Sequence, residues 1–209
     1  FRCFERMTYA NVSPYSGLEG FLPSGTFPLV RRWLDPYACS VGLSRPRRSK
    51  LGDFRRPRRG RSAQITVNRD LPPLQFLLTL THEIAHLHAF GSHRRRIRPH
   101  GKEWKHCFAV LLRELAAVEA LPRDYRNALL EHAVNPRATA QQDLKLWSVL
   151  KEIEAPEGTL LDAIAEGALF EFRGRRYLKL RTARTRCVCR DRKTGRDYYI
   201  SKAATVSPV

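Results

Sequence analysis

Cysteine is scarce in this chain of 209 residues. The five cysteines are odd in number and follow no spacing typical of a disulfide framework, which argues against a small secreted protein and favours a reducing compartment. No apolar run approaches the ~20 residues that span a bilayer, and the first residues lack the charged and then apolar pattern of a signal peptide. We therefore expect a cytoplasmic protein, associated with the nucleoid if the source is bacterial, with no membrane partner.

Acidic residues are also in short supply. The chain carries 20 Asp and Glu against 38 Lys and Arg, a net charge of +18, and residues 31–61 alone hold eleven basic and two acidic residues. Charge clustered in this way favours a polyanionic partner over a merely solvated surface, and DNA is the partner we expect. The arginines predicted to contact it form two groups, one in this segment and one near the C-terminus: Arg45, Arg47, Arg48, Arg55, Arg56, Arg58 and Arg59, and Arg175, Arg176, Arg184, Arg186 and Arg190.

Aromatic residues accompany the second group of arginines. Tyr177, Tyr198 and Tyr199 lie among them in strand-like sequence. Exposed tyrosines there would stack on unpaired bases. Strand tyrosines more often pack into the core of their own sheet, and we favour that packing.

The middle of the chain changes from a strand-like to a helical pattern. Residues 41–44 (VGLS) and 64–68 (QITVN) are short β-prone runs, and we expect the Arg-, Pro- and Gly-rich connection between them to form a basic hairpin loop. Asp70 is a candidate N-cap for the segment that follows. Residues 74–90 are apolar on nearly every side, which predicts a buried helix.

Three more helices are predicted downstream, over residues 101–122, 124–132 and 139–154, and after Pro156 the apolar period changes from helical to alternating. The length allows one substantial core and one small additional unit. The fold class we expect is therefore α+β in three parts. These are a main domain over residues 1–122, a helical connection over 123–155 and a small, basic antiparallel β-module over 156–209.

The chemistry is concentrated in THEIAHLHAFGSHRRRIRPHGKEW, residues 81–104, which holds five of the seven histidines. His82, Glu83 and His86 spell HEIAH. On a helix, two histidines four residues apart project from one face and reach a single ion, and imidazole nitrogens suit zinc. A catalytic zinc keeps three protein ligands and an open position. Glu83 stands beside the pair, where the general base for the attacking water belongs.

The third ligand must come from elsewhere in the chain. Ala89 and Ser92 stand where the metzincin pattern needs Gly and His, and His93 misses that position by one residue, which excludes the class. His88 lies about 200° around the helix from His86 and faces away from the metal.

Four candidates for the third ligand remain downstream. His106 would sit well inside the second helix, and Glu103 or Glu114 would make a carboxylate-type site. We favour His100, because the proline before it and the glycine after it mark a loop that can bring its ring back over the first helix.

The run HEIAH, followed after a basic loop by PHGKEW, resembles the SprT family of zinc metallopeptidase-like proteins, which includes the Spartan proteases. RRSKLGDFR and ITVN upstream extend the resemblance to about residues 1–120, and PHGKEW is its specific part. The resemblance implies a minimal zincin-like metalloprotease domain, in which short strands accompany the buried HExxH helix and further helices. It also implies one zinc ion held by His82, His86 and His100, with Glu83 as the catalytic base.

The resemblance further implies a zinc metalloendopeptidase that hydrolyses peptide bonds in DNA-associated proteins, with a role in DNA–protein crosslink repair. Many bacterial members end in a zinc ribbon with two Cys pairs, but only Cys187 and Cys189 occur here. We expect these two in a strand core, and we expect a monomer with a single zinc. Two alternatives stay open: a non-catalytic, zinc-containing nucleic-acid-binding protein associated with transcription, and a peptidase whose charge is incidental.

Overall fold

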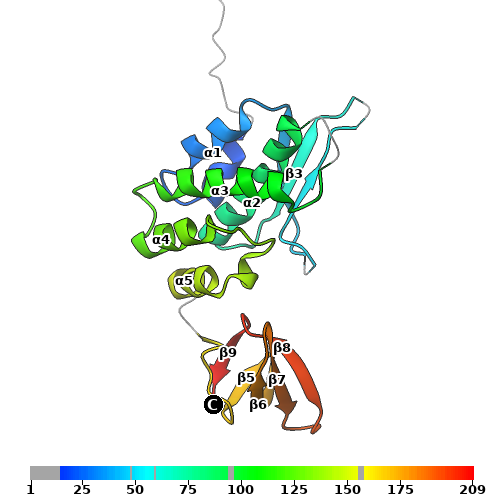
Figure 1. Ribbon diagram of the computed structural model, residues 1–209, viewed down its shortest axis with the longest axis vertical. Helices are drawn as coiled ribbons and strands as arrows, with labels where there is room; N and C mark the ends of the chain where they lie inside the picture. Colours follow the sequence, from blue (N-terminus) through cyan, green and yellow to red (C-terminus); the bar gives the residue numbers. More distant parts are fainter. Residues whose placement is uncertain (1–14, 48, 59, 94–96, 155–157) are drawn as a thin grey trace, which may run out of the picture.

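The computed structural model describes residues 15–47, 49–58, 60–93, 97–154 and 158–209. Over these residues the chain has the α+β fold that the sequence predicts, with two apolar cores. The larger core joins a small sheet to the helices, and the smaller core fills the C-terminal β-module, which lies beyond α5 at the bottom of Figure 1. None of the described helices is long and apolar enough to cross a bilayer.

The elements of the larger part precede those of the module along the chain. The larger part contains the 3₁₀ helix η1 (Ser16–Phe21), α1 (Phe27–Leu34), β1 (Cys39–Ser44), β2 (Gly52–Arg55), β3 (Ala63–Asn68), α2 (Pro73–Ser92), α3 (Lys102–Ala116), α4 (Arg123–His132), the 3₁₀ helix η2 (Ala140–Gln142) and α5 (Leu144–Glu154). The module contains β4 (Thr159–Leu160), β5 (Leu169–Phe172), β6 (Arg175–Thr182), β7 (Arg186–Asp191), β8 (Asp197–Ser201) and β9 (Thr205–Pro208).

The three-stranded sheet differs from the sequence prediction. β1 and β3 are parallel, with Val41 opposite Ile65, so no hairpin loop can join them. β2 lies inside the expected loop and pairs antiparallel with β3, which gives the order β1-β3-β2. The hairpin prediction is wrong because GDFR is too short and too polar to show a strand pattern. The tight basic turn lies instead between β2 and β3, where the backbones of Arg58 and Arg61 pair as an isolated antiparallel β-bridge.

Helix α2 is central to the larger core. Twelve of its twenty residues are buried, as its apolar pattern predicts, between the sheet on one side and α3 and α5 on the other. The predicted N-cap at Asp70 is wrong, because Pro72 occupies the cap position and no side chain caps the helix from within its own sequence. The carboxylate of Glu154, at the end of α5, accepts hydrogen bonds from the backbone N–H groups of Leu74 and Gln75 instead. This contact satisfies free donors of the first helical turn and ties α5 to α2.

The larger core continues beyond residue 122. The helices expected downstream occur as α3, α4 and α5. Tyr125 and Leu129 of α4 and Leu146 and Leu150 of α5 are buried in the same apolar cluster as α2 and α3. These helices therefore close the side of α2 that the sheet leaves open.

The β-module is an antiparallel sheet in the order β4-β9-β5-β6-β7-β8. Cys187 and Cys189 are fully buried in its core, as expected. The module contacts α5, because the indole N–H of Trp147 donates a hydrogen bond of 2.7 Å to the carbonyl of Ala203.

Candidate metal centre

Three histidine side chains converge on one face of α2. His82 and His86 lie one turn apart on the helix, and His100 lies in the loop before α3. Their Nε2 atoms are 3.2 Å apart between His82 and His86, 3.1 Å between His86 and His100, and 3.0 Å between His100 and His82. The backbone of His100 has a φ of 55°, an uncommon left-handed conformation for a residue other than glycine. That turn brings its ring back over α2.

The three nitrogens suit a metal ion. Each Nε2 atom is either a hydrogen-bond donor or an acceptor. Among three such atoms, at least one pair therefore consists of two donors or two acceptors, which cannot hydrogen-bond to each other. Tetrahedral zinc, with bonds of ~2.0–2.1 Å, separates imidazole nitrogens by about 3.3 Å, which is close to the spacing here. Among the residues that the structure describes, these three form the one cluster of His, Cys, Asp and Glu side chains able to hold a metal.

Burial keeps these imidazoles in the protonation state that binds metals. Desolvation lowers the pKa of His82 well below its usual value, and His86 and His100 lower it further. The pKa of His86 falls to about 4, through burial first and then through His100 and Arg56, and burial lowers the pKa of His100. Neutral rings have a free lone pair, so the site is in its ligating form at neutral pH.

An aromatic side chain holds the triad in place. Trp104 of α3 is fully buried, and its ring centroid lies 4.7 Å from the ring centroids of both His82 and His100 and 5.4 Å from that of His86. Its indole N–H donates a hydrogen bond of 3.3 Å to the carbonyl of His82. This explains why the tryptophan of PHGKEW accompanies the histidine: it restricts the orientations of the rings that converge.

Glu83 lies beside the triad and is no part of it. The residue is 7% exposed and lies against β2. A Cβ atom at Gly52 would stand 2.5 Å from Oε1 of Glu83 and 2.7 Å from its Cγ, so a close approach of strand and carboxyl requires glycine there. Burial and, after it, the negative charge of Asp53 together raise the pKa of Glu83 to about 8, against smaller opposing effects of Arg47 and Lys50. A carboxyl in this environment is suited to taking up a proton.

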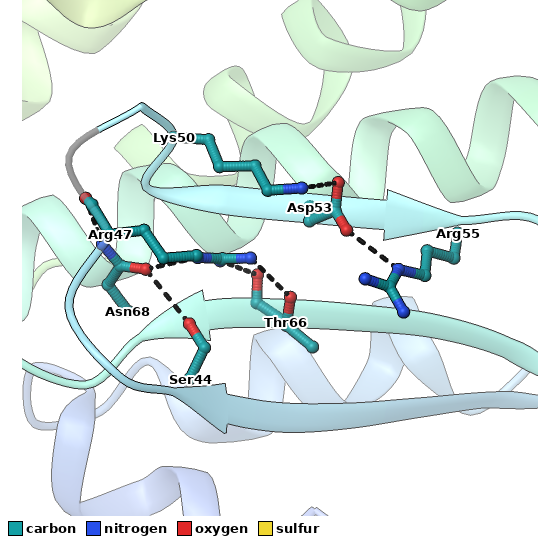
Figure 2. Close-up of polar contacts among 7 residues, drawn as sticks. All are labelled: Ser44, Arg47, Lys50, Asp53, Arg55, Thr66 and Asn68. Carbon is teal, nitrogen blue, oxygen red and sulfur yellow. Dashed lines mark hydrogen bonds and ion pairs between the residues drawn. The ribbon is translucent and has the colours of Figure 1, made fainter.

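Polar contacts on the sheet fix several of the predicted basic residues (Figure 2). The guanidinium of Arg47 donates to Oδ1 of Asn68 at 2.8 Å, and to the side chain and the carbonyl of Thr66 at 3.4 Å each. Asp53 accepts from Lys50 at 2.7 Å and from Arg55 at 3.0 Å. Arg47 and Arg55 therefore already have partners within the sheet.

The remaining predicted arginines are distributed over two surfaces. Arg48 and Arg59 lie outside the described residues. Arg56 lies on the rim of the cleft with its guanidinium 5.4 Å from the centroid of the Phe90 ring. Two arginines of the module pair with acids, Arg175 with Asp191 and Arg190 with Asp197. The exposed members with no ion pair among the described residues are Arg45, Arg56, Arg58, Arg176, Arg184 and Arg186.

The structure does not bring the alternative third ligands to the triad. Glu114 accepts hydrogen bonds from Arg32 and from the indole of Trp33. His88 contacts the carbonyl of Trp33 at 2.9 Å, away from the triad as expected, and His93 contacts the carbonyl of Ala89 at 3.0 Å. Glu103 and the exposed His106 are likewise outside the cluster.

A cleft of about 570 Å³ opens at the triad. Strand β2, helix α2, the loop with His100 and a set of residues between 132 and 150 line it. Gln75 and His132 line this cleft although the sequence analysis did not select them. The spacing of seven residues between Gln75 and His82, which puts both on one helix face, is the signal that was available for Gln75.

Gly52→Ala should destabilise the fold by about 1–3 kcal/mol, because the new methyl group collides with Glu83. Urea unfolding of the variant and of Gly42→Ala measures the effect, since a Cβ at Gly42 meets no atom within 4 Å. In a Glu83→Ala background the Gly52→Ala cost should largely vanish. An equal cost in both backgrounds would show that the strain lies in the strand and not at Glu83.

Comparison with known protein families matches residues 33–120 to the SprT-like family. The matched segment runs from the end of α1 to just beyond α3, and it contains the sheet, Glu83 and the three histidines. Helices α4 and α5 and the β-module lie outside it. Comparisons with curated proteins and with solved structures return no match. The match over residues 33–120 therefore supports the assignment of this segment to the SprT-like family.

Proposed function

We propose that the chain is a zinc-dependent endopeptidase that acts on proteins bound or crosslinked to DNA. The position of Glu83 is the observation that supports peptide hydrolysis as the reaction. It is a buried carboxyl outside the set of converging imidazoles, yet it lines the same open cleft. A site that served only to hold the helices together would have no use for such a group, because an unliganded carboxyl is costly to bury.

The residues of the cleft divide the work of peptide hydrolysis. A zinc ion held by His82, His86 and His100 would supply a Lewis acid that polarises the substrate carbonyl and acidifies water. Glu83 takes the proton from the attacking water and passes it to the leaving amine. Trp104 keeps the histidine rings oriented throughout.

Strand β2 favours an extended peptide as the substrate. It is the edge of the sheet and pairs with β3 on one side among the described residues, while Leu51, Gly52 and Phe54 line the cleft. An edge strand offers unpaired backbone donors and acceptors, and an extended peptide can satisfy them as an added strand. Such pairing would lay a peptide bond alongside the triad and Glu83.

The exposed face of the β-module supports the proposal that the protein binds DNA. Tyr177 is buried and Tyr198 packs against the module core, as expected, but Tyr199 is 63% exposed, against our expectation of core packing. Tyr199 stands opposite Val188, and Arg181 flanks Val188 on its other side. Since alternate residues of a strand share a face, Arg186 lies on the face of Val188 as well. An exposed ring on the same face as two arginines suits stacking on an unpaired base.

The purified chain should contain one zinc ion for each protein molecule. His82→Ala, His86→Ala and His100→Ala should each lose it, and Glu83→Gln should keep it, because Glu83 is no ligand in this arrangement. Elemental analysis after dialysis measures the content, with the exposed His106→Ala as the matched control. Full occupancy in His100→Ala would show that another residue is the third ligand.

Glu83→Gln should abolish cleavage while leaving zinc content and stability in place, because an amide cannot accept the proton of the attacking water. The assay is digestion of a DNA-bound protein, with and without single-stranded DNA, by wild type and variant. Equal cleavage by the two would contradict the role of Glu83. If neither cleaves any protein substrate, the non-catalytic, nucleic-acid-binding alternative is favoured.

Tyr199→Ala should weaken binding to a short single-stranded oligonucleotide by about 1–3 kcal/mol, while Tyr199→Phe retains the ring and the affinity. Arg186→Gln should reduce the slope of log affinity against log salt by about 0.7. Arg190→Gln should reduce it less, because Asp197 already engages that guanidinium at 2.7 and 3.1 Å. Fluorescence anisotropy over a salt series measures the affinity and the salt slope of all four variants. Unchanged affinity and slope throughout would exclude the module as a DNA-binding surface.

A further inference from the structure

Strand β2 and the residue directly after it run alongside α2. Gly52 lies against Glu83, and the ring of Phe54 stacks on that of His86, with a centroid separation of 6.2 Å and an interplanar angle of 4°. Side chains alternate along an extended chain, so the next residue on this face is Arg56, and it lines the cleft as the other two do. The segment thus carries a guanidinium into the cleft, two residues beyond the ring that touches the triad.

An aromatic ring holds the guanidinium of Arg56 in place. Its Cζ atom lies 5.4 Å from the centroid of the Phe90 ring, within the range of cation–π attraction. Phe90 follows His86 by about one turn of α2, and the ring of Phe54 lies 6.2 Å from each of these two rings. The charge of Arg56 also helps to lower the pKa of His86. The guanidinium is therefore positioned beside the triad, although the side chain is exposed.

Arg56 has no acidic partner in the described part of the chain. The acidic side chains that line the cleft are Asp53 and Glu83. Asp53 already accepts hydrogen bonds from Lys50 and Arg55, as Figure 2 shows, and Glu83 lies against the start of β2. An oriented guanidinium without a partner suits a carboxylate, which its planar fork binds through two parallel hydrogen bonds. A ligand in the cleft is the source left for that carboxylate.

An extended peptide paired with β2 would place one of its side chains opposite Arg56. Residues directly opposite each other in paired strands share a face, with Cβ atoms about 4.5–5.5 Å apart. Phe54, two residues earlier on this face, stacks on the His86 ring of the triad. Two residues of an extended chain cover about 6.6–6.8 Å. A peptide bond at the triad therefore stands about two residues from the side chain opposite Arg56.

We propose that Arg56 forms a specificity subsite for an acidic side chain, Asp or Glu, about two residues from the bond that is cut. The subsite rests on the proposed peptidase function for its substrate. It also removes Arg56 from the set of arginines predicted to contact DNA. A DNA phosphate is the other anion that a guanidinium binds, but Arg56 lines the cleft next to the triad, whereas the exposed Arg45 and Arg58 lie outside its lining.

Peptide hydroxamates, which anchor on a metal, test the subsite without requiring catalysis. One series carries the hydroxamate at the C-terminus of the peptide and a second carries a succinyl hydroxamate at the N-terminus, so the two series cover both sides of the metal. In each series the second residue from the hydroxamate is Glu, Gln or Lys. Calorimetry on the zinc-loaded full chain should show, in one series, the Glu probe binding about threefold to tenfold more tightly than the Gln probe, and the Lys probe binding most weakly.

Substitution of Arg56 should change this order of affinities. Arg56→Gln should make the Glu and Gln probes bind about equally, and Arg56→Glu should reverse the order so that the Lys probe binds best. The matched control is Arg58→Gln, which alters an exposed arginine of the same basic turn and should retain the preference. High salt should weaken the preference of the wild type, because the guanidinium is exposed to solvent ions.

Equal affinity for the Glu and Gln probes in both series, a preference that survives Arg56→Gln, or no binding of any probe overturns the subsite. Arg56→Gln should leave the salt slope of oligonucleotide binding unchanged. A smaller slope together with unchanged probe affinities would show that Arg56 contacts phosphate instead. Cleavage of peptides without a preference for acidic residues contradicts the subsite alone, and a probe preference without any peptide cleavage contradicts the peptidase function alone.

Discussion

The burial of α2 is the constraint on which the rest of the structure depends. A helix that is apolar on nearly every side has to be covered on every side, so the sheet, α3 and α5 all pack against it. The few polar groups on that helix are consequently shielded from water. Desolvation then keeps the histidines neutral and raises the pKa of Glu83, which are the conditions that a metal site and a general base require.

One helix also sets the spacing of the cleft. Gln75, Leu78, Thr79, His82 and His86 recur at intervals of three or four residues, so they form a single face that is open to the cleft. Because a helix is stiff, the distance from the triad to Gln75 is fixed by the fold and not by loop conformation. One wall of the cleft is therefore a stiff helix, and residues of β2, α4 and α5 line the cleft as well.

The segment shared with the SprT-like family is not a complete cleft. Glu154 caps α2 from the end of α5, and Tyr125 donates a hydrogen bond from α4 to the carbonyl of Leu74. Removal of these helices would expose the first turns of α2 and open the end of the cleft. The candidate metal ligands and Glu83 thus lie within residues 33–120, while the cleft that surrounds them is formed partly by residues that follow. The module adds a basic face and contacts this body through Trp147.

The sequence by itself determined what depends on short spacing: the buried helix, the pair His82 and His86, the adjacent Glu83, and the change to strands after Pro156. His100 was favoured because a flanking proline and glycine mark a loop. Only the tertiary structure decided that β2 is a strand, that Gly52 touches Glu83, and that Glu154 caps α2 from 79 and 80 residues away. It also showed that Arg47 is engaged by Asn68 and that Gln75 and His132 share a cleft. Such contacts join residues distant in sequence, and local periodicity carries no information about them.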